Sequence, residues 1–390
     1  MPGPRHGSLL LLTAAVLVAG CGDGSHVRMS VSPPVSLWDA PVRLAISGLR
    51  PHERVAVRAN GRAVALVADA AGRVDLAGDA SLRVMWLLDP RIPPAGGTRL
   101  TLTAAGAQPA LTRLRRAAGV RVRLLRPRSE GFYGDFYAPA RAQDRPGILV
   151  FGGSEGGLSP YPREMAALFA SHGYPSLALA YFHEPGLPAN LDRIPLEYFA
   201  SALRWLSRRP GVDAERLVVA GISRGSEAAQ LLGIHYPRLV HAVIAMVPDS
   251  GSARGITPFT GVVGSAHCLG AAWTAGGKPV PYARFTGPAN PFPFHDERIE
   301  GPVLLDCGGF DELWASCPMA QVIVSRLLAH RFRHAVTLLY YPRAGHGAGP
   351  LLPTPAGLSF LDGATPDANI TADANGWPRL LRFLRRLADS

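Results

Sequence analysis

The segment Gly221-Ile222-Ser223-Arg224-Gly225 constrains this chain more than any other, because it lies between an apolar run and a helix-like run. Arg216 to Ala220 has the composition of a buried strand, and the residues from Ser226 onward have that of a helix. A serine on a sharp turn between strand and helix is typical of a nucleophile elbow. Small flanking residues allow the close approach of strand and helix, and the helix N-terminus stabilises negative charge. A plain glycine-rich turn is the alternative.

The order of strands and helices predicts two domains in the 390-residue chain. Residues 28–128 contain short alternating strands separated by turns, which indicates an N-terminal β-sandwich. From residue 129 to 390 strands alternate with helices, which indicates a mainly parallel α/β sheet covered on both faces. The residues from about 249 to 300 read as an irregular insertion rich in Pro, Gly and aromatic side chains, expected either to cap a pocket or to pack as a surface excursion.

The first 20 residues predict an export signal of the lipoprotein type. Arg5 and His6 precede a short apolar run that ends at Val18-Ala19-Gly20-Cys21. Acylation of Cys21 would tether the mature chain to a membrane in the cell envelope, on the extracytoplasmic side. An ordinary secretory signal with a chance cysteine is the alternative.

The remaining cysteines, Cys268, Cys307 and Cys317, permit one intramolecular disulfide in an exported protein and match no zinc template. A bridge from Cys268 to either of the others would fasten the insertion, and the sequence does not choose between them.

The formal net charge of +11 suggests nucleic-acid binding at first sight. The arginines are scattered, however, and Lys278 is the only lysine, so we expect no nucleic-acid partner.

A serine nucleophile needs a histidine to take its proton and an acid to orient that histidine. Asp311 follows the predicted strand that begins at Val303, with Glu312 as its rival and a helix N-cap as its alternative role. His346 lies in a glycine-flanked loop after the predicted strand Val336 to Tyr341. This loop position favours it over the other candidate histidines, which are His295, His330 and His334.

The backbone N–H of Arg224 and one from Gly153 or Ser154 are expected to form the oxyanion hole. The loop Gly152 to Gly157 lacks the Gly-Lys-Ser/Thr ending of a phosphate-binding loop. No metal or cofactor is expected.

Residues from about 28 to 390 resemble the family of acyl-CoA thioester hydrolases and bile acid-CoA:amino acid N-acyltransferases, in the α/β-hydrolase superfamily. The segments that carry the likeness are Pro146-Gly147-Ile148, Phe151-Gly152-Gly153, Leu177 to Phe182, Leu196 to Phe199, Gly221 to Gly225, Asp311 to Trp314 and Tyr341 to His346.

The resemblance implies an α/β-hydrolase fold with an N-terminal β-sandwich and a triad of Ser223, Asp311 and His346. It also implies a serine hydrolase that cleaves acyl thioesters through an acyl-enzyme, since the amino-acid-conjugating members use cysteine. CoA is scarce outside the cytoplasm, so a carboxylesterase or amide hydrolase with an extracytoplasmic substrate is the runner-up. A non-catalytic envelope binding module is a third hypothesis.

Overall fold

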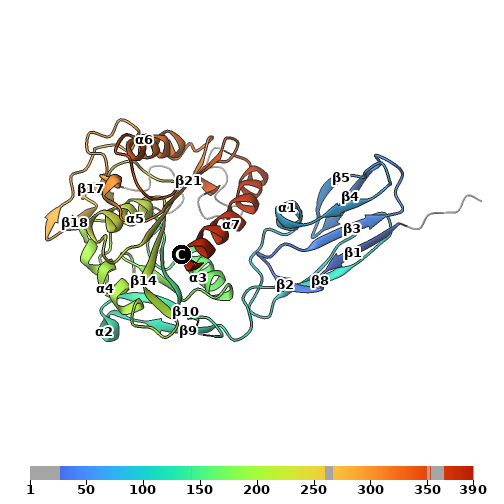
Figure 1. Ribbon diagram of the computed structural model, residues 1–390, viewed down its shortest axis with the longest axis horizontal. Coiled ribbons are helices and arrows are strands. Elements are labelled where there is room, and N and C mark those ends of the chain that lie inside the picture. The colour runs from blue at the N-terminus through green and yellow to red at the C-terminus, as the bar shows by residue number, and fades with distance from the viewer. Residues whose placement is uncertain (1–26, 142, 260–266, 349–351, 353–363, 390) are drawn as a thin grey trace, which may run out of the picture.

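The computed structural model describes residues 27–141, 143–259, 267–348, 352 and 364–389. The predicted signal segment and Cys21 lie outside these residues. A smaller N-terminal domain and a larger C-terminal domain, called the catalytic domain after the function that its sequence motifs predict, follow one another along the long axis of the molecule (Figure 1). Within the described residues, no helix combines the length and the apolar character needed to cross a membrane.

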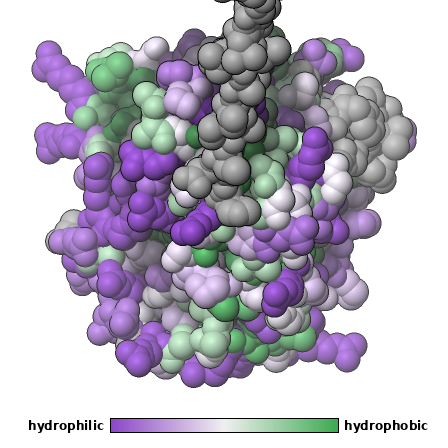
Figure 2. Space-filling model, turned by 90° about the vertical axis from the view of Figure 1, so that its right-hand side faces the viewer, coloured by the Kyte–Doolittle hydropathy of each residue, from purple (hydrophilic) through white to green (hydrophobic). Residues whose placement is uncertain are grey.

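The N-terminal domain is a set of small β-sheets around one apolar core. Sheets β1-β3-β6 and β2-β8-β7 and the hairpin β4-β5 enclose side chains such as Leu44, Val57 and Leu100. The strands are β1 (Arg28–Ser32), β2 (Val35–Leu37), β3 (Arg43–Ser47), β4 (Arg54–Ala59), β5 (Arg62–Val67), β6 (Val74–Leu76), β7 (Thr98–Thr101) and β8 (Ala110–Leu114). Buried and exposed residues alternate along β3 and β4, as in sheets with one solvated face. Figure 2 shows that hydrophilic residues dominate the surface at this end of the molecule.

Helix α1 (Gly78–Leu88) is an element that the strand pattern did not predict. Its buried residues include Leu82, Met85 and Trp86, at helical spacing, and it packs between the two domains. In Figure 1 it lies on the side of the N-terminal domain that faces helix α7 (Pro366–Asp389).

The catalytic domain contains an eight-stranded sheet in the order β21-β20-β15-β14-β11-β12-β10-β9. Its strands are β9 (Arg121–Leu125), β10 (Tyr133–Ala138), β11 (Arg145–Phe151), β12 (Ser176–Ala180), β14 (Val212–Ile222), β15 (Ala242–Met246), β20 (Val303–Gly308) and β21 (Val336–Tyr341). In this order, each pair of adjacent strands from β21 to β12 is parallel. Strands β10 and β9 are added at the edge in antiparallel pairing. The α/β fold class is therefore confirmed.

The domain boundary lies earlier than the expected residue 128. Strand β9 has the short, arginine-rich pattern of the preceding strands, yet it pairs with β10 in the catalytic sheet. Its membership depends on the partner strand, which local periodicity does not reveal.

Helices cover both faces of the sheet. Successive residues of each central strand point to opposite faces, and in these apolar strands both faces must be shielded from water. Leu149 and Phe151 of β11 join the core under α4 and α5, whereas Ile148 and Val150 join the core under α3 and α7. The helices are α2 (Pro127–Glu130), α3 (Pro160–Ser171), α4 (Leu196–Leu206), α5 (Arg224–His235), α6 (Ser316–Ala329) and α7 (Pro366–Asp389). Figure 1 shows α3 and α7 on the side of the sheet that faces the N-terminal domain.

The insertion after β15 is more regular than the sequence indicated. It contains β16 (Arg254–Ile256), β17 (Cys268–Ala271), β18 (Trp273–Ala275), β19 (Lys278–Pro279) and the 3-10 turn η1 (Asp296–Arg298). Strand β18 pairs with β13 (Ile194–Pro195), which directly precedes α4. The insertion is thus joined to the catalytic domain.

Candidate active site

Ser223 occupies the turn between β14 and α5, with φ 54° and ψ −123°. A positive φ is unfavourable for a residue with a side chain and is kept only where the surroundings enforce it. The Ser223 N–H donates to the carbonyl oxygen of Met246 at 2.9 Å, which ties the turn to β15. A Cβ on Gly225 would lie 2.2 Å from the Gly152 carbonyl oxygen, so only glycine permits this approach.

Asp311 and His346 lie in contact at the carboxyl edge of the same parallel sheet. Asp311 follows β20, His346 begins the turn η2 (His346–Ala348) after β21, and Asp311 Oδ2 is 2.9 Å from His346 Nδ1. The Asp311 side chain is 1% exposed and that of His346 13%. Ser223 directly follows the last residue of β14 at this same edge, because β14, β15, β20 and β21 are parallel. Side chains from the ends of several strands can therefore act together there.

The rival side chains lie elsewhere. Glu312 is exposed, and the Asp311 carboxylate, not that of Glu312, contacts the imidazole. His295 contacts Glu297 and Arg326, and His330 follows the last residue of α6. The His334 ring packs near Phe332.

The loop that carries Asp311 is held at several points. Asp311 Oδ1 accepts the backbone N–H groups of Leu313 and Trp314 at 3.1 and 3.2 Å. The Trp314 indole donates to the Val247 carbonyl oxygen at 3.1 Å. A Cβ on Gly308 would lie 2.2 Å from the Gly345 carbonyl oxygen, so the acid loop and the histidine loop pack in direct contact.

A disulfide between Cys307 and Cys317 encloses this loop. Both cysteines are buried, whereas Cys268 is exposed and unbridged. The sequence left the pairing of the three cysteines open, and the structure joins Cys307 to Cys317, so neither of the possible bridges from Cys268 is formed. Cys268 lies on β17 in the insertion, while Cys307 and Cys317 lie at the end of β20 and the start of α6, with Cα atoms 5.0 Å apart.

The loop after β11 approaches the Ser223 turn, as the oxyanion prediction requires. A Cβ on Gly153 would lie 3.0 Å from Ser223 Cβ, and Ser154 follows directly. The Gly153 N–H, however, donates to Glu155 Oε2 at 3.0 Å, so a carboxylate of the chain occupies this donor. The Arg224 N–H is in the first turn of α5 and therefore has no acceptor within its own helix. Ser154 and Arg224 are the remaining predicted donors.

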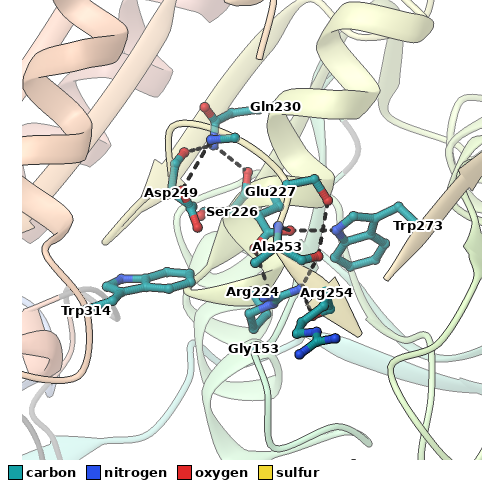
Figure 3. A network of polar contacts seen from close by, with 12 residues as sticks. Gly153, Arg224, Ser226, Glu227, Gln230, Asp249, Ala253, Arg254, Trp273 and Trp314 are labelled. Atoms are coloured by element: carbon teal, nitrogen blue, oxygen red, sulfur yellow. Dashed lines mark hydrogen bonds and ion pairs between the residues drawn. The ribbon is translucent and has the colours of Figure 1, made fainter. Parts of the chain in front are cut away.

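A buried polar network behind the nucleophile turn was missed by the sequence interpretation, which assigned only the backbone of Arg224. Figure 3 shows the Arg224 side chain, Glu227 and Trp273 joined by hydrogen bonds and an ion pair. Trp273 lies in the insertion that was expected either to cap a pocket or to pack as a surface excursion, and it is fully buried. The available signal was the Arg-x-x-Glu spacing at the start of the predicted helix, which places two opposite charges about one helical turn apart.

Burial changes the titration of the acids in this region. It raises the pKa of Asp249 to about 8, with the charge of Glu227 adding to the effect. It also raises the pKa of Asp306 well above its ordinary value, while the Val247 N–H that Asp306 accepts opposes the shift. Among the described residues, no three metal-ligating side chains come together as a metal site.

The larger, C-terminal part of the chain is similar to known proteins. Residues 194–256 and 282–388 match the family described as BAAT / Acyl-CoA thioester hydrolase C terminal. The chain is 28% identical to acyl-coenzyme A thioesterase 6 of Mus musculus over 420 residues, which span 92% of this chain and 96% of that protein. It is 28% identical to acyl-coenzyme A thioesterase 1 of Homo sapiens over 403 residues, which span 90% and 94%.

Among solved structures, the chain is similar to MGS-M1, an alpha/beta hydrolase enzyme from a Medee basin deep-sea metagenome library. That likeness has 19% identity and a TM-score of 0.47, and it covers 70% of this chain and all of that one. The family match and the near-full-length relatives agree with the resemblance seen in the sequence motifs. The C-terminal part of the chain thus matches the BAAT / acyl-CoA thioester hydrolase family model, and nearly the whole chain is similar to acyl-coenzyme A thioesterases.

Proposed function

We propose that this protein is a serine hydrolase that cleaves acyl thioesters through an acyl-enzyme on Ser223. The relatives named acyl-coenzyme A thioesterases support a thioester or ester hydrolase. The observation that carries the serine mechanism is the 2.9 Å contact between Asp311 and His346, at the same edge of the parallel sheet as the strained Ser223 turn. A buried carboxylate on Nδ1 leaves Nε2 as the proton acceptor of the imidazole.

In the proposed reaction, Ser223 Oγ attacks the thioester carbonyl carbon and its proton passes to His346 Nε2. Asp311 stabilises the imidazolium, and the backbone N–H groups of Arg224 and Ser154 donate to the oxyanion. The C–S bond then breaks, and the departing sulfur takes the proton from His346 to leave as a thiol. Water attacks the acyl-enzyme with His346 again accepting a proton, which returns to Ser223 Oγ as the carboxylic acid departs.

A second candidate substrate is an oxygen ester or amide outside the cytoplasm. The Cys307–Cys317 disulfide favours it, because disulfides persist in oxidising compartments, where acyl-CoA is scarce.

We also propose that acylated Cys21 anchors the protein to a membrane. Replacing Cys21 with serine would then release soluble protein or leave an uncleaved precursor, with hydrolysis unchanged, and wild-type protein found soluble in the cytoplasm with its N-terminus intact would oppose the anchor.

A substrate panel tests the function. The purified protein is assayed with acyl-CoA, acyl esters of a small thiol, and oxygen esters of matched acyl length, alongside Ser223→Ala. The thioesterase assignment predicts turnover of thioesters that Ser223→Ala lowers by several orders of magnitude. Preference for oxygen esters with the same loss would support the second candidate, and undiminished turnover by Ser223→Ala would refute both.

A further inference from the structure

Two charged side chains are buried in the helix that begins directly after Ser223. The Arg224 side chain is 7% exposed, the Glu227 side chain is fully buried, and Arg224 Nε lies 3.2 Å from Glu227 Oε1. Burying an ion pair costs desolvation energy, which further hydrogen bonds must offset. The groups that hydrogen-bond to this pair therefore indicate its structural role.

The pair binds the insertion. Arg224 Nη2 donates to the carbonyl oxygens of Ala253 and Arg254 at 3.2 and 3.0 Å. Glu227 Oε2 accepts the Trp273 indole N–H at 2.7 Å and the Ala253 backbone N–H at 3.4 Å. Figure 3 shows these contacts around the first turn of α5. The insertion and the nucleophile helix are thereby joined at one buried point.

Trp273 extends the connection to the oxyanion loop. Its ring packs against Tyr181, with ring centroids 5.6 Å apart. The Tyr181 hydroxyl lies 3.0 Å from the carbonyl oxygens of both Gly152 and Gly153. Trp273 thus contacts a residue of the helix that begins at the nucleophile and a residue that holds the loop opposite it.

We propose that Glu227 and Trp273, with the Arg224 side chain, are positioning residues that fix the nucleophile helix relative to the loop 152–154. This rests on the proposed serine mechanism, in which N–H groups from these two segments converge on one oxygen. Such donors stabilise the oxyanion only when each lies about 3 Å from it. A small displacement of either segment therefore reduces the stabilisation of the transition state more than it reduces the affinity for substrate.

Trp273→Phe is the sharpest test, because it removes one N–H and keeps an aromatic ring beside Tyr181. We expect kcat for a thioester to fall about tenfold or more with KM little changed. The rate of inactivation by a fluorophosphonate should fall in parallel, since that reaction needs the same oxyanion site. The acid limb of the pH profile should not move, because Asp311 and His346 are untouched.

Trp205→Phe is the matched control. The Trp205 indole also donates to a glutamate, Glu130 Oε2 at 2.7 Å, in the same domain. It packs against Phe132 and Phe136. Trp205→Phe should therefore keep both rates within about twofold of wild type. A folded Trp273→Phe protein with wild-type kcat and inactivation rate would overturn the proposal.

Tyr181→Phe provides a second variant in case Trp273→Phe does not fold. It removes only the hydroxyl that binds Gly152 and Gly153, and it should give the same loss of kcat and of inactivation rate. Wild-type rates in this variant would count against the proposal as well. Failure of the serine mechanism is separately visible, because wild-type protein would then resist the fluorophosphonate.

Discussion

The Trp314 indole stands edge-on to the His346 imidazole, with ring centroids 5.7 Å apart and an interplanar angle of 72°. The same indole donates to the carbonyl oxygen of Val247, which has the unfavourable φ of 41°. Val247 directly follows Met246, the residue that accepts the Ser223 N–H. Trp314 therefore connects the histidine to the strand end that supports the nucleophile turn.

Trp314→Phe should lower kcat about three- to tenfold, because it keeps a ring against His346 and loses the bond to Val247. Trp314→Leu should lower kcat further, since neither contact survives. Steady-state kinetics of the two variants provide the check. Equal, wild-type-like kcat in both would show that Trp314 has no part in orienting His346.

Removing the disulfide should loosen the loop that carries Asp311. Replacing Cys307 and Cys317 together with serine opens a loop of ten-residue sequence separation. The chain-entropy estimate for such a loop is about 3 kcal/mol of unfolding free energy. Denaturant unfolding should show this loss, and kcat should fall with it. Cys268→Ser is the control, because Cys268 is exposed and unbridged, and it should match wild type.

Asp249 should make stability depend on pH. Its pKa of about 8 in the folded protein lies above the ordinary value of about 3.9 in the unfolded chain. The folded state therefore binds this proton more tightly, so the contribution is complete below pH about 4 and is lost as pH rises toward 8.

Asp249→Asn should accordingly flatten the fall in unfolding free energy between pH 5 and pH 8. Asp296, with a pKa of about 7, titrates in the same window in both proteins and cancels in the difference between them. That difference reports Asp249 together with its effect on the neighbouring buried acid Glu227. Parallel curves for variant and wild type would rule out the shift at Asp249.

The two domains should depend on Asp39 for their attachment. Its buried Oδ2 lies 2.6 Å from His172 Nε2 and accepts the Trp377 indole N–H at 2.8 Å, which joins the N-terminal domain to α3 and α7. Asp39→Ala should lower the unfolding free energy by roughly 2–4 kcal/mol, because buried donors lose their acceptor.

Asp367→Ala is the matched comparison for Asp39. Asp367 pairs with Arg62 across the same two domains, but the side chains are 65% and 40% exposed, respectively. Its loss should cost less than about 1 kcal/mol. Equal effects of the two substitutions in denaturant unfolding would contradict the importance of the buried contact.

Local patterns predicted the parts of the molecule that depend on neighbouring residues. The strand, glycine turn and helix around Ser223 form a continuous segment, and Asp311 and His346 were placed by following two strands to their ends. Helix α1 was missed although Leu82, Met85 and Trp86 recur at helical spacing, because turn signals surround it.

Features that join distant segments could not be predicted from the sequence. The pairing of β9 with β10 set the domain boundary, and the proximity of Cys307 to Cys317 set the disulfide. Glu227 and Trp273 are 46 positions apart, so no local pattern indicates their contact. The bond from Gly153 to Glu155 depends on a side-chain conformation, which residue types alone leave open.

Trapping the acyl-enzyme tests the central claim most directly. Rapid acid quench of the protein during turnover of an acyl thioester, followed by peptide mass spectrometry, locates any covalent acyl group. We predict one acyl adduct on the peptide that contains Ser223, absent from Ser223→Ala. Thioester turnover by Ser223→Ala at the wild-type rate, or an adduct on another residue, would contradict the account.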